Sequence, residues 1–397
     1  MESKAKNFFA NAPYLLFFLL YWCAISFFEP YMSLFLSERG LDGAEIGIIS
    51  CALYIVTLVA AFFMGYLADR SGRPKLVLII TLAGIMAATW GIRQAHGVFP
   101  LTVACIFYGF FNAPATDLAD KLALRNIPNA MRHYSIFRMG GSVGYCVGTL
   151  LAGAVIAGFG FLVSLDILIV AMAGCILSCL GMSRARNDRG VVHGKVPLGE
   201  IFKNPKAYYI YGCMALWGVV SGGGLSYASF YVDQMGFDTN FAAWLIAAAM
   251  VGQMLMFLLV PAILRKLGEE ASVSLALVLL FFRIGALALC RHLPLWAVLG
   301  LHFLGGPSEP LMLCAIVSMV NSTFSARVSS TSQALKSVAS KGIGSSLGTL
   351  VLGIMFDKIA PFWVMVSVAC ACLVFAAIAW VWFKALNNRI AIPASRG

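Results

Sequence analysis

The chain has 397 residues, of which 61% are hydrophobic and only 11% are charged, and its formal net charge is +11. Soluble domains contain about 25% charged residues, so this composition excludes a soluble protein and indicates one that crosses a membrane many times. The basic excess does not indicate a nucleic-acid partner, because the positions of the charges follow a membrane topology.

Apolar stretches of roughly 20 residues, long enough to span a bilayer as helices, recur along the whole chain. The first contains Glu29 and Pro30 and no small-residue cleavage site after a short core, so we expect a retained span rather than a signal peptide. The predicted fold is an all-α membrane protein with twelve transmembrane helices in two pseudo-symmetric six-helix bundles. The predicted spans are 13–36, 45–67, 75–94, 98–121, 134–159, 161–182, 207–232, 240–265, 271–290, 294–320, 328–356 and 360–384.

The longest polar connection, residues 183–206, is basic and lies near the middle of the chain, which predicts a cytoplasmic linker between bundles 1–182 and 207–397. Lys and Arg favour the cytoplasmic side of a membrane. With a cytoplasmic N-terminus, 20 of the 28 Lys and Arg residues fall in inside segments and 4 in outside loops. We therefore expect a multi-pass protein of the cytoplasmic (inner) membrane with both termini in the cytoplasm. The other basic residues lie within spans, namely Arg138, Arg283, Lys336 and Lys341.

One pair of spans repeats a pattern of small residues. Gly144, Gly148, Thr149, Leu150 and Gly153 of the fifth span recur 200 positions later, as Gly344, Gly348, Thr349, Leu350 and Gly353 of the eleventh. Such glycines let helices approach closely, although small-residue faces also recur by chance. Together with six spans on each side of the linker, the match predicts two related halves that alternate access to a central site.

The loop after the second span reads GYLADRSGRPK, from Gly65 to Lys75. Its glycines permit a tight turn, and an acid at a helix end can accept from backbone N–H groups or nearby cations. The loop resembles the loop 2–3 signature of the major facilitator superfamily, and the alternative is a chance turn between spans. The resemblance implies that this loop stabilises one conformer rather than binding solute. The residues that carry it are Gly65, Asp69, Arg70, Gly72 and Arg73.

The stretch NAPATDLADK, followed by FRMGGSVGY, is similar to the lactose permease and phenylpropionate permease type of proton symporters. The resemblance makes Asp117 the solute-binding acid, Arg138 its partner and Tyr145 the aromatic that stacks on the solute. At these positions this chain has Asp in place of Glu and Tyr in place of Trp, so the resemblance does not determine that the solute is a sugar. A carboxylate, a guanidinium and a ring face suit hydroxyls, carboxylates and apolar ring faces. The alternative is a structural Asp–Arg pair that locks two helices.

The same resemblance places a functional arginine at Arg283 and a functional histidine at His302, but it places its proton-releasing acid at Gly305. Glu309 lies one helical turn further on and Glu29 precedes Pro30, so these two acids are the candidate proton carriers. The alternatives are that Glu309 lies at a broken helix end and that His302 is only a satisfied hydrogen-bonding group. Lys341, in the eleventh span, is predicted to contact the solute or to pair with an acid.

The predicted function is proton-coupled uptake of a small polar organic solute by alternating access. The solute is a sugar or glycoside if Asp117 and Tyr145 dominate solute binding, and an organic acid if Arg138 and Lys341 dominate it. The alternative is proton-antiport efflux of drugs or metabolites, against which Thr149 counts because efflux relatives carry a proline there. We expect neither an enzyme nor a channel, no cofactor or metal, no nucleic acid, and a monomer in the lipid bilayer, since no catalytic motif is evident and the cysteines lie in apolar runs.

Overall fold

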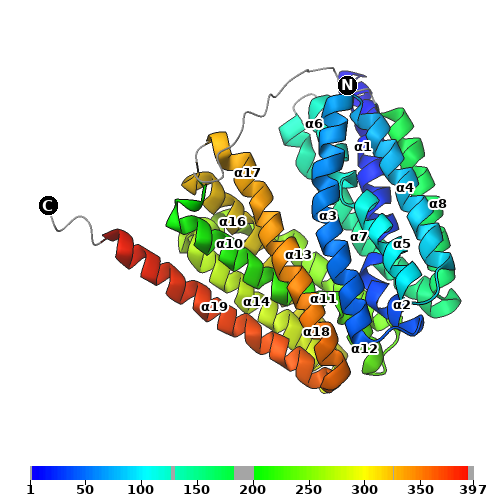
Figure 1. Ribbon diagram of the computed structural model, residues 1–397. Helices are drawn as coiled ribbons and strands as arrows, with labels where there is room; N and C mark the ends of the chain where they lie inside the picture. The colour runs from blue at the N-terminus through cyan, green and yellow to red at the C-terminus, as the bar shows by residue number, and fades with distance from the viewer. Residues whose placement is uncertain (1, 127–129, 183–200, 325, 392–397) are drawn as a thin grey trace. The chain divides into compact units, whose positions relative to one another are not determined.

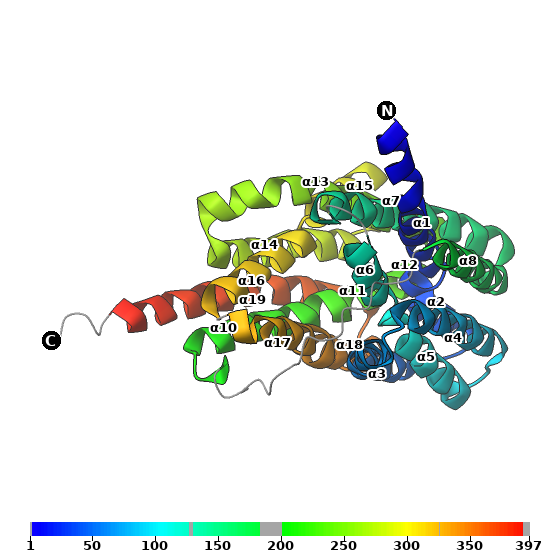
Figure 2. The ribbon, with the colours of Figure 1, turned by 90° about the horizontal axis from the view of Figure 1, so that it is seen from above.

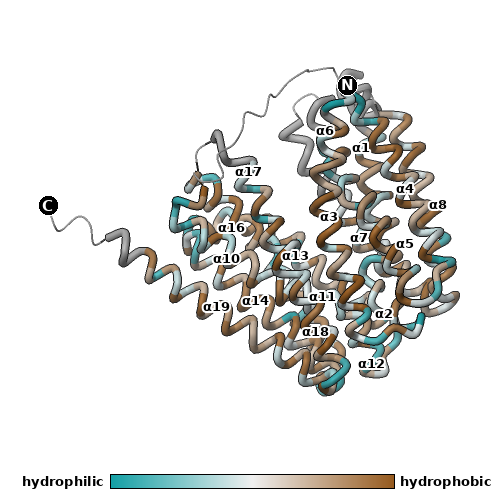
Figure 3. Tube along the Cα trace, viewed as in Figure 1, coloured by the Kyte–Doolittle hydropathy of each residue, from teal (hydrophilic) through white to brown (hydrophobic). Residues whose placement is uncertain are grey.

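The computed structural model describes residues 2–126, 130–182, 201–324 and 326–391, and within these ranges it is helical with no β-strand. Most of the predicted linker therefore lies outside the described residues. Eleven helical segments in the described part are long and apolar enough to cross a membrane, and each overlaps a predicted span. The all-α membrane fold is confirmed, and Figure 3 shows apolar residues along the helices with polar residues near their ends. These segments are Ala12–Glu38, Gly43–Ala68, Pro74–Gln94, Val98–Ala123, Met139–Phe159, Phe161–Gly181, Thr239–Leu267, Glu269–Ala288, Leu295–Thr323, Thr331–Lys358 and Pro361–Leu386.

The remaining predicted span, 207–232, is helical but interrupted. It comprises α10 (Pro205–Trp217), the π-helix η2 (Gly218–Gly223), α11 (Gly224–Ser226) and α12 (Ala228–Gln234). Glycine has low helix propensity, and three consecutive glycines end η2 and begin α11. The tyrosines and glycines of this segment also make it less apolar than the other spans.

The described helices fall into two compact units (Figures 1 and 2). Unit 1 takes in residues up to Val191 together with Ser229–Ala247, and unit 2 takes in Val192–Ala228 and Ala248 onward. Unit 1 holds α1 (Glu2–Ile25), η1 (Glu29–Tyr31), α2 (Met32–Glu38), α3 (Gly43–Ser71), α4 (Pro74–Gln94), α5 (Val98–Asn112), α6 (Ala115–Asn126), α7 (Ala130–Phe159), α8 (Phe161–Gly181), α12 and the start of α13 (Thr239–Leu267). Unit 2 holds α10, η2, α11, the rest of α13, α14 (Glu269–Ala288), α15 (Leu295–Gly305), α16 (Ser308–Thr323), α17 (Ala326–Ser337), the π-helix η3 (Val338–Ser345), α18 (Ser346–Lys358) and α19 (Pro361–Ala391).

The glycines of the predicted repeat perform the same packing task in both units. In unit 1, α7 lies against α1, and a Cβ atom added to Gly148 would lie 2.6 Å from the Cys23 carbonyl oxygen and 2.8 Å from its Cα. In unit 2, α18 lies against η2, and a Cβ atom added to Gly348 would lie 3.0 Å from Val219 Cα. All three distances are shorter than ordinary van der Waals contact, so each glycine permits a backbone approach that any side chain would prevent.

Two buried tyrosines extend the repeat beyond the residues that the sequence indicated. The Tyr31 hydroxyl donates to the Thr149 carbonyl oxygen at 2.9 Å in unit 1, and the Tyr227 hydroxyl donates to the Thr349 carbonyl oxygen at 3.1 Å in unit 2. The tyrosines are 196 positions apart, and the same offset relates two pairs of turn glycines with positive φ. These are Gly40 (84°) with Gly236 (83°), and Gly72 (62°) with Gly268 (82°). The two halves therefore share turns and anchoring hydrogen bonds as well as glycine faces.

Candidate functional site

The predicted charged site residues lie where helices are interrupted. Glu29 begins η1 after α1 has ended at Ile25, and Asp117 and Glu309 each lie in the first turn of a helix that follows a break. Lys341 lies within the π-helix η3. All four side chains are exposed. Interrupted helices in membrane proteins occur where the freed backbone is buried in protein or lines a cavity, and π-helical turns are frequent at functional sites.

A hydrogen-bonded chain in unit 1 connects α1, α5 and η1. The Tyr21 hydroxyl donates to Asn112 Oδ1 at 2.7 Å, and Asn112 Nδ2 donates to Glu29 Oε1. Tyr21 is 2% exposed, whereas the Glu29 side chain is exposed. Asn112 is the last residue of α5, so the end of that helix carries the amide that holds the acid.

Other polar and aromatic side chains surround this chain. Asp117 and Glu29 are both close enough to the Tyr21 hydroxyl to interact with it electrostatically, and Glu29, Tyr21 and Tyr145 interact in the same way with Tyr108. The Tyr108 hydroxyl is buried and has no hydrogen-bond partner among the described residues. The rings of Trp22 and Tyr145 meet edge to face with centroids 6.0 Å apart. We call these residues the unit 1 cluster, namely Tyr21, Trp22, Glu29, Tyr108, Asn112, Asp117 and Tyr145.

The unit 1 cluster thus brings together three predicted site residues, Glu29, Asp117 and Tyr145. The side chains of two others, Arg138 in α7 and Asp69 in α3, lie outside the part of the chain that the structure describes. The pairing of Asp117 with Arg138 therefore stays a prediction. Sequence reasoning missed Tyr21, Trp22, Tyr108 and Asn112. The only signal for Asn112 was its position five residues before Asp117 at a Pro-containing break.

In unit 2, Gln253 of α13 donates through Nε2 to Glu309 Oε2 at 2.7 Å. Helix α13 can approach the junction of α15 and α16 because glycines lie at the contact. A Cβ atom added to Gly306 would lie 2.8 Å from the Ala249 carbonyl carbon, and one added to Gly252 would lie 3.0 Å from Pro307 Cδ. The close approach of these glycines places the amide of Gln253 beside Glu309, in the first turn of α16. Sequence reasoning identified Glu309 but not Gln253.

Arg283 and His302 are both buried in unit 2, at 7% and 3% exposure, and are close enough to interact electrostatically. Nδ1 of His302 has no hydrogen-bond partner within the described residues. A Cβ atom added to Gly305 would lie 2.7 Å from the Arg283 backbone nitrogen and 2.8 Å from its Cα. The position to which the resemblance assigns its proton-releasing acid therefore has no room for any side chain.

The lysines of the eleventh span lie near each other. Lys336, in α17, interacts electrostatically with Lys341 and with Cys314 of α16. Neither lysine forms an ion pair with Glu309 within the described residues. The predicted contact of Lys341 with solute stays a prediction.

The loop of the predicted conformational motif joins α3 to α4. Gly72 adopts a φ of 62°, which favours glycine, and Arg70 and Arg73 are exposed on either side of it. A Cβ atom at Gly65 would meet nothing within 4 Å. Next to the motif, Lys75 Nζ donates to the carbonyl oxygens of Leu180 and Met182 at 2.9 and 2.6 Å. Lys75 therefore ties this loop to the end of α8, where a cation is favourable.

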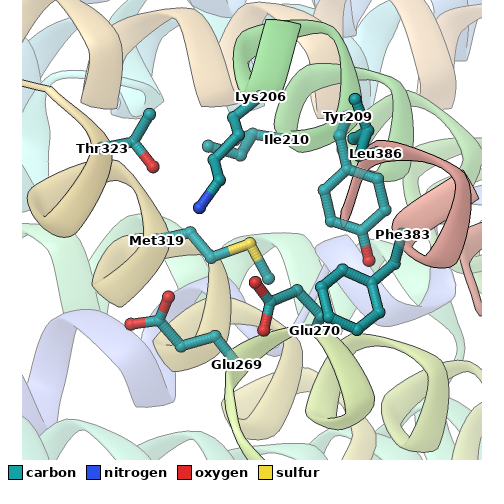
Figure 4. Close-up of a pocket in the computed structure, with 9 residues that line it drawn as sticks. All are labelled: Lys206, Tyr209, Ile210, Glu269, Glu270, Met319, Thr323, Phe383 and Leu386. Carbon is teal, nitrogen blue, oxygen red and sulfur yellow. The ribbon is translucent and has the colours of Figure 1, made fainter. Parts of the chain in front are cut away.

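Two polar features lie apart from these groups. Arg93 Nε pairs with Asp166 Oδ1 at 2.8 Å and joins α4 to α8 within unit 1. A small pocket lies in unit 2 where α10 and α14 begin, and Figure 4 shows the Lys206 ammonium reaching into it. None of the predicted site residues lines this pocket, which is formed by Lys206, Tyr209, Ile210, Glu269, Glu270, Met319, Thr323, Phe383 and Leu386.

Comparison with known proteins gives consistent matches over most of the chain. A model of the MFS_1 like family matches residues 13–367. The chain is 27% identical to the maltose permease of Geobacillus stearothermophilus, over 86% of this chain and 87% of that protein. It is 21% identical to the probable 3-phenylpropionic acid transporter of Escherichia coli strain K12, over 89% and 93% of the two chains. Among solved structures, the nucleoside transporter NupG matches with a TM-score of 0.83 and 16% identity, over 94% of this chain and 99% of that one, and this likeness concerns the fold alone.

Proposed function

The chain belongs to the MFS_1 like family, so it is a membrane transporter rather than an enzyme, and we propose that it takes up a hydroxylated ring solute together with protons. The solute class we favour is a sugar or glycoside. The same proposal places the chain in the inner membrane as a monomer with both termini in the cytoplasm, in accord with the distribution of Lys and Arg.

The observation that supports this proposal best is the composition of the unit 1 cluster. Glu29 and Asp117 supply carboxylate oxygens that accept hydrogen bonds from hydroxyl groups, and both side chains are exposed. Tyr145 and Trp22 supply ring surfaces to the same cluster, and an aromatic surface suits the apolar face of a sugar ring. By its name, the maltose permease relative carries a sugar, which accords with this combination.

The competing solute is an organic acid, held by the guanidinium of Arg138 or the ammonium of Lys341. The probable 3-phenylpropionic acid transporter supports that choice by its name. The two solute classes differ in charge, so a direct uptake comparison separates them. Asp117 is expected to contribute most to the binding of a sugar. The cations are expected to contribute most to the binding of an organic anion, which Asp117 repels.

The test is uptake by the full chain in proteoliposomes with an inward proton gradient, using maltose, other disaccharides, aryl glycosides and 3-phenylpropionate. We expect concentrative uptake of a glycoside, and we expect Asp117→Asn to reduce it at least about tenfold, since a charge-assisted hydrogen bond contributes roughly 1.5–3 kcal/mol. Asp166→Asn is the matched control, because it makes the same chemical change at an acid outside the cluster.

Full uptake by Asp117→Asn would exclude this acid from the solute site. Equal uptake with and without the inward proton gradient would contradict proton coupling. Dye accumulation in everted vesicles on acidification of their interior would instead support the alternative of proton-antiport efflux.

A further inference from the structure

Two acids in different units occupy closely similar local settings. Glu29 precedes Pro30 and Glu309 precedes Pro310, and each lies in the first turn of the helix that follows an interruption. Each has an exposed side chain. Each accepts a hydrogen bond from a primary carboxamide on another helix.

In unit 1 the orientation of the carboxamide is fixed by its second partner. The Tyr21 hydroxyl donates to Asn112 Oδ1 at 2.7 Å, so the oxygen end of the amide faces Tyr21 and the NH₂ end faces Glu29. Tyr21 is itself held in place by a stacked contact with Phe17, with ring centroids 5.7 Å apart, and is 2% exposed. The acid is therefore positioned by a rigid, buried support.

In unit 2 the corresponding amide is Gln253, whose Nε2 lies 2.7 Å from Glu309 Oε2. The residue before it, Gly252, packs against the end of α15, so the backbone that carries the amide is fixed relative to the break from which α16 starts. The acid is again positioned from a neighbouring helix.

A carboxamide is a particular kind of partner for an acid. Its N–H stabilises the ionised carboxylate, but it adds no positive charge, so protonation remains accessible in a way that a direct Lys or Arg partner would oppose. When the acid is protonated, the carboxamide can still donate to the carbonyl oxygen, or it can turn and accept from the acid hydroxyl. The hydrogen bond therefore survives in both protonation states.

Other titratable groups lie near each acid or on the helices packed against it. Around Glu29 they include Tyr21 on α1, Tyr108 on α5, Asp117 on α6 and Tyr145 on α7. On the elements in contact with α16 the described ones are Glu269, Glu270 and Arg283 on α14, Lys336 on α17, and Lys206, Tyr208, Tyr209, Tyr211 and Cys213 on α10. Glu269 accepts hydrogen bonds from Ser318 and Ser322 of α16 itself. His302 lies on α15, which precedes α16, and Lys341 on η3 interacts electrostatically with Lys336. The variants described below change the amides and leave all of these charged groups in place.

We propose that Asn112 and Gln253 are positioning residues for two proton-binding carboxylates, Glu29 in unit 1 and Glu309 in unit 2. Uptake then depends on two protonatable sites rather than one. This inference rests on the proposed function, because it assumes that uptake is coupled to protons.

The test is the pH profile of solute uptake by the full chain in proteoliposomes, comparing wild type with Asn112→Leu and Gln253→Met. Each variant keeps the acid and removes its amide donor, so the protonated form is favoured and the midpoint of the profile moves to higher pH by about one unit. Tyr21→Phe gives a second unit 1 variant, which removes the hydroxyl that orients Asn112 and is expected to cause a smaller shift in the same direction. The control is Gln333→Met, because the amide of Gln333 bonds to Val317 and Asn321 at 3.4 Å rather than to an acid.

A shift in both amide variants, with an unchanged profile in Gln333→Met, supports two positioned sites. An unchanged midpoint in Gln253→Met or in both unit 1 variants overturns the proposal, as does an equal shift in Gln333→Met. These outcomes differ from failure of the proposed function, in which wild-type uptake itself shows no dependence on pH.

Discussion

Gly305 is the position at which the sequence resemblance and the packing of the helices disagree most directly. Restoring the acid of the resembling symporters, as Gly305→Glu, is expected to prevent folding rather than to supply a proton carrier. The smallest version of the change is Gly305→Ala. Its Cβ atom would lie 2.7 and 2.8 Å from backbone atoms of Arg283, where ordinary contact is 3.4–4 Å, and a backbone cannot rotate away. Forcing a methyl group into such a contact destabilises a packed interior by about 1–3 kcal/mol.

The assay is thermal unfolding of the purified protein in detergent. Each kcal/mol lost lowers Tm by about 2–4 °C in a chain of a few hundred residues, so we expect a fall of about 2–12 °C. Gly300→Ala is the matched control in the same helix, because a Cβ atom there meets nothing within 4 Å. We expect it to be neutral or stabilising by up to about 1 kcal/mol, since alanine favours a helix. Equal Tm values for the two variants would refute the packing argument and reopen position 305 to an acid.

Further predictions concern contacts that hold each unit together. Tyr31→Phe and Tyr227→Phe each remove one buried hydroxyl-to-carbonyl hydrogen bond, so each is expected to destabilise the protein by about 1 kcal/mol and to lower Tm to a similar extent; a loss in only one of them would show that the two bonds are not equivalent. Asp166→Asn breaks the ion pair with Arg93. The side chains of Arg93 and Asp166 are 31% and 49% exposed, so we expect less than about 1 kcal/mol of destabilisation and unchanged uptake. A large fall in Tm or a loss of uptake in Asp166→Asn would place this pair among the functional groups.

The helical spans could be predicted from the sequence because the membrane requires long apolar segments whatever the tertiary fold. The interrupted segment of α10, η2, α11 and α12 shows the limit of that rule. Its apolar residues predicted a span at 207–232, but its glycines and tyrosines break the helix into pieces, and the packing of η2 against η3 and α18 compensates for the weak helix propensity.

The candidate site was predictable only in part, and for a physical reason. Charged residues within apolar runs are conspicuous, which is why Glu29, Asp117 and Glu309 were identified from the sequence. Neutral polar partners such as Asn112 and Gln253 are not conspicuous, because amides occur in membrane helices for many reasons. Their role depends on which acid they face, and the tertiary packing of helices distant in sequence determines that, as the glycines between α13 and the start of α16 do for Gln253.

The two halves differ most where the chemistry is concentrated. The anchoring tyrosines and turn glycines are duplicated with an offset of 196 positions, but the residue 196 positions after Glu29 is the apolar Leu225. The acid of unit 2 instead lies in the first turn of α16, next to a different break, and it has a different carboxamide partner, Gln253. Packing has thus remained duplicated while the charged groups have not.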